Sequence, residues 1–265
     1  MDTAFGVLRV PPRSTKPRRT GLTVVNDRGL SLRQAEDLIE VHGGIVDYAK
    51  ITDFVGLIAY YSADFVRQKT ALFRKNGIGC LPGGIAFQIA ALQDAAPQFF
   101  ERTAELGFSA VEISEDSIPN QPPERRREWV RQAQELGLEV FTEIGKKVPD
   151  SPLSLDESVA SIEADFALGV KKVVIEKSDL VLLKDTNPDL VQAIAERVGQ
   201  DRLVFEGGPN EFPHLPKWLI ETFGPEVNLE NLEVHEAHRV EGMRRGLDRY
   251  VDYDFLRLEG GRVPV

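Results

Sequence analysis

A strand-like apolar run followed by an amphipathic helix pattern occurs eight times along this 265-residue chain. Each unit takes roughly 25 to 35 residues, the spacing expected where strands and helices alternate. The runs are apolar throughout rather than alternating, as in parallel strands that are buried on both faces. They span residues 22–26, 45–50, 78–81, 108–113, 139–143, 172–176, 202–206 and 227–228. The repeat predicts an α/β fold, a single (β/α)8 TIM barrel with one strand for each run.

Helix patterns fill the intervals between these runs. They cover residues 31–42, 62–76, 94–106, 122–136, 155–168, 187–198, 211–223 and 235–247. Gly107, Gly137 and Gly169 stand just after three of them, where helices commonly end. A doubly wound open sheet is the competing architecture, but it often carries a glycine-rich nucleotide turn. No GxGxxG motif occurs in this sequence.

The chain divides into an N-terminal arm (residues 1–18), the barrel (19–247) and a C-terminal extension (248–265). The arm is rich in Pro, Arg and Lys, so we expect an extended segment. It can cover the barrel floor, contact a neighbouring subunit or remain a loose terminus. The extension, which carries Phe255 and Leu256, can pack on the barrel or on another subunit.

Composition argues against several classes of partner. The net charge of -10 argues against binding to nucleic acid or to an anionic membrane. No apolar stretch approaches the roughly 20 residues that span a bilayer, and no apolar signal segment opens the sequence. The single cysteine, Cys80, suits a reducing cytosol because it cannot form an internal disulfide. We therefore expect a cytoplasmic protein with no membrane or nucleic-acid partner.

Charged and polar residues stand at or just after the ends of the predicted strands. They are Asn26, Asp27, Lys50, Glu112, Ser114, Glu143, Lys146, Lys147, Glu176, Lys177, Glu206 and Asn228. A charge at the end of a buried strand costs several kcal/mol unless it is paired or solvated. Because the carboxyl ends of barrel strands share one face, we expect these groups to form one polar pocket there.

The acidic strand ends predict a cation site. They are Asp27, Glu112, Glu143, Glu176 and Glu206. Carboxylates gathered in one mouth repel one another, and hard oxygen ligands suit Mg2+, which takes one or two of them and keeps several waters. Neighbouring lysines can offset part of the repulsion, so a structural ion-pair network is the alternative. The histidines show no HxH or HExxH spacing at a strand end, so zinc is not expected.

Two glycine turns follow predicted strands, Pro82-Gly83-Gly84 and Gly207-Gly208-Pro209. Glycines at the start of a helix let backbone N–H groups approach an anion, and the helix N-terminus adds a favourable dipole. The loops after the seventh and eighth strands of barrels are frequent phosphate sites. A phosphate site and a plain Pro-Gly turn are both compatible with these residues.

One block, Thr142-Glu143-Ile144-Gly145-Lys146-Lys147, is the most distinctive part of the chain. Together with other segments in order, it resembles the phosphosulfolactate synthase family over about residues 19–247. The other segments are 19–29, 47–50, 81–84, 110–114, 174–176, 204–206, 227–229 and 243–247. Members of this family are (β/α)8 barrels that add sulfite to phosphoenolpyruvate in a Mg2+-dependent reaction, toward coenzyme M in methanogens. Plant heat-stress proteins share the fold.

The resemblance implies an enzyme, a carbon–sulfur lyase or synthase, with a small anionic substrate and assembly into homo-oligomers. It implies that Glu112, Glu143, Glu176 and Glu206, or a subset of them, hold Mg2+. Lys146 or Lys50 would bind the substrate carboxylate or, with a lowered pKa, protonate C2, and Glu143 would take part in catalysis. Substrate and phosphate contacts would come from Asp27, Gly83, Gly84, Ser114, Lys147, Lys177, Gly207, Gly208 and Asn228.

The substrate-facing loops depart from the family pattern. Gln88 stands where members usually carry Glu, and residues 177–180 replace an Arg-Glu-Ser-Gly run. Lys in place of Arg at a bidentate anion site is not a conservative change. The substrate can therefore differ, with another nucleophile or another phosphorylated enol acid. The alternatives are an aldolase or isomerase acting on a sugar phosphate, and a non-catalytic stress or binding protein that kept the barrel.

Overall fold

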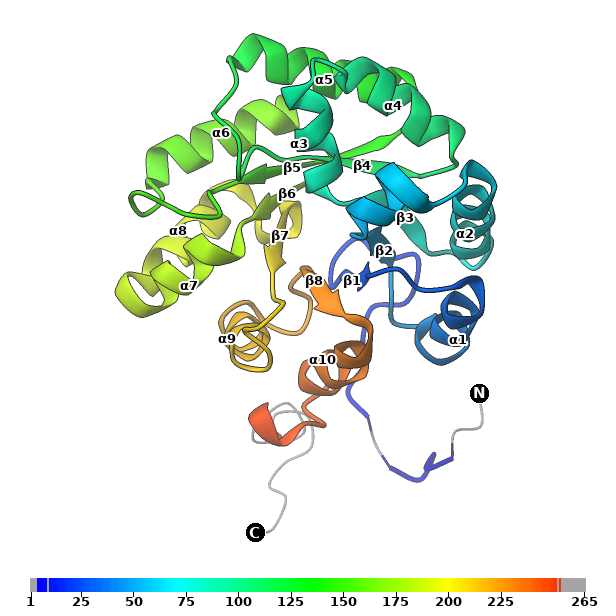
Figure 1. Ribbon diagram of the computed structural model, residues 1–265. Coiled ribbons are helices and arrows are strands. Elements are labelled where there is room, and N and C mark those ends of the chain that lie inside the picture. The colour runs from blue at the N-terminus through cyan, green and yellow to red at the C-terminus, as the bar shows by residue number, and fades with distance from the viewer. Residues whose placement is uncertain (1–3, 9, 252, 254–265) are drawn as a thin grey trace.

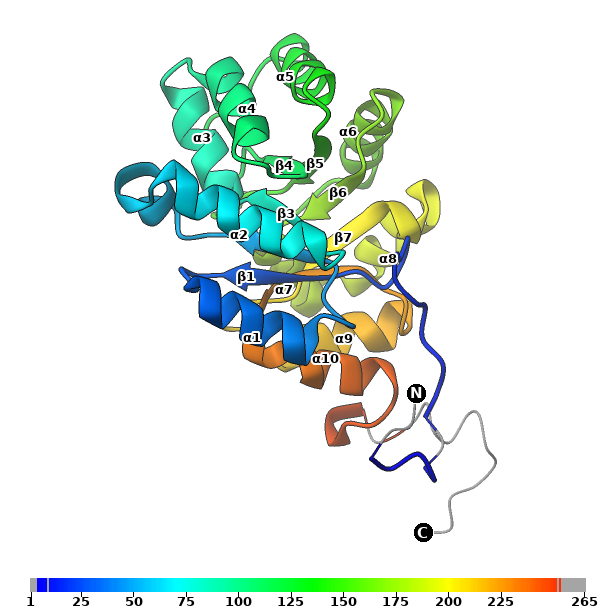
Figure 2. The same cartoon turned by 90° about the vertical axis from the view of Figure 1, so that its right-hand side faces the viewer.

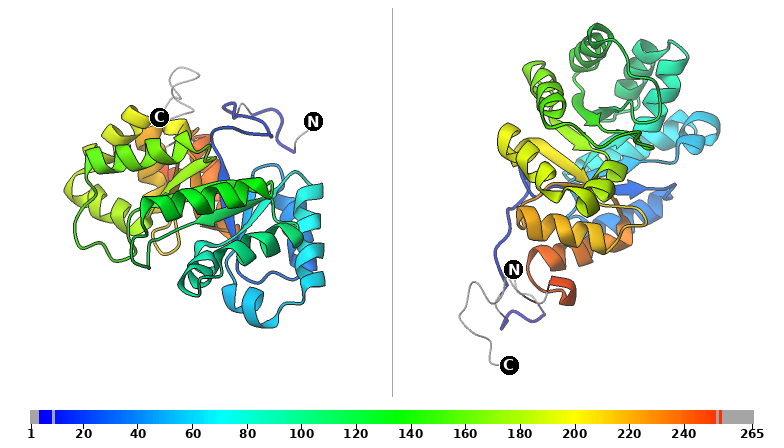
Figure 3. Two further views of the ribbon diagram at one scale, coloured as in Figure 1. Left: turned by 90° about the horizontal axis from the view of Figure 1, so that it is seen from above. Right: turned by 90° about the vertical axis from the view of Figure 1, so that its left-hand side faces the viewer.

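The computed structural model describes residues 4–8, 10–251 and 253. Eight parallel strands lie at the centre and helices surround them, as two further views show (Figures 1 and 3). The strands are β1 (Thr23–Asp27), β2 (Tyr48–Ile51), β3 (Gly79–Pro82), β4 (Ala110–Ile113), β5 (Glu139–Ile144), β6 (Lys172–Ile175), β7 (Leu203–Glu206) and β8 (Leu229–Glu233). The predicted (β/α)8 barrel is confirmed.

The α-helices of the described chain lie mostly where the sequence patterns predict them. They are α1 (Leu32–His42), α2 (Ala63–Lys75), α3 (Gly84–Leu92), α4 (Ala96–Glu105), α5 (Pro123–Glu135), α6 (Leu155–Ala167), α7 (Lys177–Thr186), α8 (Pro188–Val198), α9 (His214–Phe223) and α10 (Ala237–Arg244). Two of them, α3 and α7, are absent from the predicted set. Both are short and start directly after strands β3 and β6. None of the described helices combines the length and apolar character needed to cross a membrane.

The strands follow the sheet order β3-β2-β1-β8-β7-β6-β5-β4. Parallel ladders join each neighbouring pair in this order, for example Asn26 opposite Lys50 and Glu206 opposite Glu230. At the remaining seam, the Ser109 N–H donates to the Cys80 carbonyl at 2.9 Å, which brings β4 beside β3. The barrel is therefore nearly closed.

The strand pleat explains how the barrel presents its charges. Six side chains fill the lower interior: Tyr48, Leu81, Ala110, Phe141, Val174 and Val204. Side chains two positions apart on a strand point to the same face. The next layer toward the carboxyl ends therefore comes from Lys50, Gly83, Glu112, Glu143, Glu176 and Glu206. An apolar plug thus lies beneath a layer of charge.

The second half of the N-terminal arm covers the amino ends of the strands. The buried Arg13 side chain pairs with Glu226 and Glu241, which lie around the start of β8 and on α10. The Lys16 ammonium donates to the carbonyls of residues 43 and 46, at 3.0 and 2.6 Å. In Figure 2 the dark blue arm enters β1 at the end opposite its arrowhead. These contacts place residues 11–21 over the barrel floor.

The last strand begins later in the chain than the sequence predicts. Strand β8 begins at Leu229, so the predicted run 227–228 lies before it and not within it. Val227 is fully buried although it lies outside the strand, so its apolar side chain does not mark a strand residue. Most of the predicted extension, with Phe255 and Leu256, lies outside the described residues.

Candidate active site

A cavity of about 210 Å³ opens at the carboxyl ends of the strands. Its charged and polar lining includes Lys50, Thr52, Gln88, Glu112, Ser114, Asp116, Glu143, Lys147, Glu206 and Asn231, together with the turn at Gly83 and Gly84. The predicted convergence of strand-end residues at one rim is thus observed for Lys50, Glu112, Glu143 and Glu206. Glu176 lies within the same cluster, because one of its oxygens is within 4.8 Å of oxygens of Asp116 and Glu143.

Lys50 lies at the base of this cavity and is 3% exposed. Its ammonium is 2.7 Å from Glu112 Oε2 and 2.9 Å from Glu230 Oε1. Burial alone would lower the pKa of Lys50, but the surrounding carboxylates, Glu112 and Glu230 first, raise it well above its ordinary value. The predicted lowered pKa is therefore wrong for Lys50. The prediction needs neighbouring cations, whereas the groups around Lys50 are carboxylates, which stabilise its protonated form. The residue is a fixed positive charge.

Asp116, Glu143 and Glu176 form the group best suited to a divalent cation. One carboxylate oxygen from each lies within 4.8 Å of the others. Asp116 follows β4 in a loop, where the Ser114 hydroxyl accepts its N–H at 3.2 Å and the Gln88 amide donates to its carboxylate. Asp116 is not among the residues that the strand-end pattern predicts. It lies four residues beyond Glu112, so a pattern that is limited to the strand ends does not include it.

The predicted ligands Glu112 and Glu206 lie beside this triad. Glu112 Oε1 accepts the Gly84 N–H at 3.2 Å, and its other oxygen faces Lys50. Glu206 accepts the Lys177 N–H at 3.0 Å and also the Asn231 amide. Mg2+ prefers oxygen ligands, takes one or two carboxylates and keeps several waters, so the residues present fit the cation that the sequence predicts.

Burial and, after it, mutual repulsion control the protonation of these acids. Burial, then the neighbouring carboxylates, raise the pKa values of Glu143 and Glu206 well above their ordinary range. Burial likewise raises the pKa of Glu112 to about 7, although Lys50 opposes it. Burial alone would raise the pKa of Glu176 too, but a hydrogen bond from the Glu206 carboxyl and the Lys147 ammonium lower it to about 2. In the metal-free protein several of these acids therefore hold protons that ordinary carboxyl groups would lose.

The two lysines of the distinctive block point to different places. Lys147 Nζ lies 2.8 and 3.0 Å from the two Glu176 oxygens and 3.7 Å from Glu206 Oε2. Lys146 Nζ instead donates to the carbonyls of Glu115 and Ile118, at 2.6 and 2.9 Å. The structure therefore brings Lys147 to the carboxylates and leaves the Lys146 ammonium in the loop after β4. The catalytic role of Lys146 stays a prediction, without support from its position.

Asp27 does not reach the cavity. By the strand alternation its side chain faces α2, where Lys69 Nζ lies 2.9 Å from Asp27 Oδ2. Asp27 Oδ1 also accepts the N–H groups of Gly29 and Leu30. Both Asp27 and Lys69 are almost fully buried. Lys69 lies within a helix, so no strand-end pattern could identify it as the partner.

Other predicted substrate contacts lie away from the cavity. Asn228 precedes β8 at the barrel floor, where it accepts the Leu22 N–H at 3.0 Å and donates to the Leu203 carbonyl at 2.7 Å. Its placement at a strand end was wrong, because β8 starts one residue later. The Gly207 N–H donates to the Glu230 carbonyl, so the sheet occupies it. A Cβ atom at Gly208 would lie 2.7 Å from the Asn231 carbonyl oxygen, which leaves no room for a phosphate on that side.

The predicted residue Lys177 also points elsewhere. Its ammonium donates to the Pro209 carbonyl at 3.1 Å and so ties the loop after β6 to the loop after β7. Gly83, Gly84 and Ser114, in contrast, line the cavity beside the N-terminus of α3. Of the predicted substrate and phosphate contacts, those that line this cavity are Gly83, Gly84, Ser114 and Lys147.

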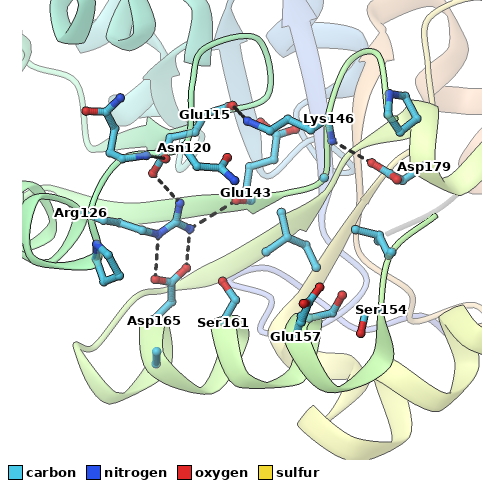
Figure 4. Close-up of a pocket in the computed structure, with 18 of the residues that line it drawn as sticks. Glu115, Asn120, Arg126, Glu143, Lys146, Ser154, Glu157, Ser161, Asp165 and Asp179 are labelled. Atoms are coloured by element: carbon cyan, nitrogen blue, oxygen red, sulfur yellow. Dashed lines mark hydrogen bonds and ion pairs between the residues drawn. The ribbon is translucent and has the colours of Figure 1, made fainter. Parts of the chain in front are cut away.

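A second cavity, of about 680 Å³, lies between α5 and α6 under the loop after β5. Figure 4 shows Arg126 at one side of it, between Glu115, the backbone of Glu143 and Asp165. Arg126 forms ion pairs with both acids, at 3.0 and 2.6 Å. Arg126 also donates to the Glu143 carbonyl at 3.3 Å, so this network holds the main chain of β5 in place. The charged side chains of Arg126, Glu115 and Asp165 are thus paired with one another.

Comparisons with known proteins find one family to which this sequence is similar. A family profile for (2R)-phospho-3-sulfolactate synthase (ComA) matches residues 11–249. A phosphosulfolactate synthase of Methanothermobacter thermautotrophicus is 32% identical over 253 residues, which cover 92% of this chain and 95% of the relative. A phosphosulfolactate synthase of Bacillus subtilis is 28% identical over 249 residues, which cover 91% of this chain and 95% of the relative.

Solved structures support the fold at low sequence identity. DHDPS from Cyanidioschyzon merolae aligns with a TM-score of 0.56 at 12% identity and covers 91% of this chain and 80% of its own. The 3-dehydroquinate dehydratase from Enterococcus faecalis gives 0.54 at 14% identity, with 88% and 100% covered. These likenesses show the barrel alone. On the family match and the two relatives, the chain belongs to the (2R)-phospho-3-sulfolactate synthase family and is a barrel enzyme of that family.

Proposed function

We propose that this chain catalyses the Mg2+-dependent addition of sulfite to phosphoenolpyruvate, which forms phosphosulfolactate. The observation that carries the proposal is the triad of Asp116, Glu143 and Glu176 at the mouth of a barrel of this family. In the reaction, the sulfur lone pair of hydrogen sulfite forms a bond to C3 of phosphoenolpyruvate. The C2–C3 double bond becomes single, and C2 gains the proton that the hydrogen sulfite loses.

The residues of the mouth would divide this work between cation binding and charge balance. Asp116, Glu143 and Glu176 would hold the cation, which supplies positive charge beside the substrate carboxylate as negative charge grows there. Lys50 stays protonated and adds a fixed positive charge from below. The anionic substrate would be positioned by these charges before the carbon–sulfur bond forms.

The phosphate would bind at the turn after β3. Gly83 and Gly84 line the cavity where α3 begins, so the helix dipole favours an anion there. Their own N–H groups donate to the Ile51 carbonyl and to Glu112 Oε1, so the dipole and the open space of the turn, not these two N–H groups, support this assignment. Ser114 adds a hydroxyl group on the same wall. This assignment keeps one of the two predicted glycine turns as the phosphate site.

One alternative loses support from the lysine environment. An aldolase of the imine-forming type needs an unprotonated lysine as nucleophile. Lys50 lies between two carboxylates with a raised pKa, so its amine keeps its proton. Lys177 donates to a backbone carbonyl and does not line the cavity. Borohydride with a sugar phosphate is therefore expected to trap no lysine.

The proposal is tested by product formation from phosphoenolpyruvate and sulfite, followed by phosphorus NMR. We expect turnover with Mg2+, none in EDTA, and recovery when Mg2+ is restored. Glu143→Gln is expected to lower kcat at least about a hundredfold, as the loss of a charge-stabilising group does. Glu157→Gln, a change to an acid on α6 that lines the second cavity, is the matched control and should retain activity. Absence of product from the wild type with Mg2+ would contradict the proposal.

A further inference from the structure

We propose that the Lys147 ammonium occupies the cation site in the metal-free protein and moves out when the cation binds, so that it then binds the anionic substrate. This inference rests on the proposed function, because it assumes a cation at Asp116, Glu143 and Glu176. It assigns Lys147 a role that couples the binding of the two ligands.

The position of the ammonium carries the first step. Lys147 Nζ bonds to both oxygens of Glu176, at 2.8 and 3.0 Å, and lies 3.9 Å from Asp116 Oδ2. Asp116 and Glu176 are two of the three members of the triad. A cation bound to their oxygens would stand within a few ångströms of the ammonium, and the like charges would repel strongly in this mostly buried site. The two cannot both keep these contacts.

The local backbone lets the side chain move without a rearrangement of the loop. The Lys147 N–H donates to the Asp116 carbonyl at 3.1 Å, which fixes the main chain at the rim. The side chain is 46% exposed, whereas that of Glu176 is fully buried. The lysine can therefore leave by rotation about its own bonds, and the carboxylate stays in place.

The destination follows from the lining of the cavity. Lys147 lines the same cavity as the turn at Gly83 and Gly84 and as Ser114. A released ammonium would therefore remain in the cavity that also contains the proposed phosphate site. Lys50, the other cavity-lining lysine of the described chain, remains held by Glu112 and Glu230. Lys147 is thus the mobile positive charge available to a bound anion.

Linkage gives the measurable consequence. If the cation releases Lys147 and an anion then binds it, the anion strengthens cation binding, and the cation strengthens anion binding by the same factor. In the absence of an anion, removal of the competing ammonium should tighten cation binding. A residue that only stabilises the fold would produce neither effect.

The test measures Mn2+ binding by electron paramagnetic resonance, with and without sulfate, for the wild type, Lys147→Met and Lys146→Met. The last variant is the matched control, since it removes the adjacent charge, which is held by two backbone carbonyls. We expect Lys147→Met to bind Mn2+ at least about threefold more tightly than the wild type and to lose the sulfate effect. Lys146→Met should bind Mn2+ like the wild type and keep the sulfate effect.

Three results would overturn the inference. One is Mn2+ binding by Lys147→Met that is no tighter than that of the wild type. Another is an equal gain in Lys146→Met, which would indicate charge alone, and the third is a sulfate effect that persists in Lys147→Met. If the wild type binds Mn2+ and forms product while any of these holds, the lysine exchange fails and the proposed function stands. If neither the wild type nor Lys147→Met binds Mn2+, both fail.

Discussion

The Lys50 ammonium lies 2.7 Å from Glu112 Oε2, although β3 separates the strands that carry these two residues. Gly83 follows this intervening strand, and a Cβ atom there would lie 3.3 Å from Thr52 Cγ2. The ion pair therefore spans the barrel mouth from β2 to β4. This pair holds both side chains at the base of the cavity that Asp116 and Glu143 also line.

Loss of this cation should destabilise the barrel. Lys50→Met leaves the carboxyl groups of Glu112 and Glu230 buried without their partner. We expect the free energy of unfolding to fall by about 3–5 kcal/mol near neutral pH, as when one member of a buried ion pair is removed. Urea denaturation followed by circular dichroism measures it. The double variant Lys50→Met/Glu230→Gln should lose less, because one buried acid is neutralised, and an equal or larger loss would refute this account.

The carboxylate cluster should make the metal-free protein less stable as the pH rises from about 4.5 to about 7. Folding raises the pKa of Glu112 from 4.5 to about 7 and raises those of Glu143 and Glu206. The folded state therefore holds more protons than the unfolded state over this window, so the free energy of unfolding falls as the pH increases. Glu176, with its pKa lowered to about 2, contributes stability that is complete above 4.5 and is lost only at lower pH.

Urea titrations in EDTA between about pH 5 and about pH 7 measure this dependence. Glu112→Gln should flatten the slope, because it removes one of the groups that gains a proton on folding. Mg2+ should restore stability mainly at the upper end of the range, where fewer protons compete with the cation for the carboxylates. A free energy of unfolding in the wild type that rises across the window in EDTA, with no change in Glu112→Gln, would rule out the assignment.

The turn after β3 should not tolerate a side chain at Gly84. A Cβ atom there would lie 2.6 Å from Glu112 Oε1 and 2.8 Å from Ser114 Cβ. We expect Gly84→Ala to displace Glu112 and lower kcat/KM by roughly a hundredfold, the cost typical of about 1 Å of misplacement. Gly44→Ala is the control, since nothing lies within 4 Å of its Cβ and its φ is not positive. Equal activity of the two variants would show that the cavity wall adapts.

The pair of Asp27 and Lys69 should be structural. Lys69→Met leaves Asp27 buried and unpaired by its cation, so we expect a loss of about 3–5 kcal/mol in the free energy of unfolding. In the double variant Asp27→Asn/Lys69→Met this loss should shrink, while KM for phosphoenolpyruvate stays near that of the wild type. Thermal and urea unfolding give the first quantity and initial rates give the second. A large rise in KM would instead indicate that Asp27 contributes to substrate binding.

The sequence by itself determined the architecture and most of the charged layer. Eight apolar runs of similar spacing specify a parallel sheet, because each strand is buried on both faces, and the number of eight favours a barrel over an open sheet. An acid or lysine two positions beyond an interior apolar residue must then point into the mouth, as Glu112, Glu143 and Glu206 do. Periodicity alone is sufficient for these residues.

Only the tertiary structure decided which of these groups meet. Asp116 joins the triad from a loop, Lys69 reaches Asp27 from a helix, and Lys146 and Lys147 separate although they are adjacent in sequence. Loop conformation and long-range pairing control these positions, and neither leaves a periodic signal. The direction of each pKa shift has the same origin, because it depends on the charges that folding brings together.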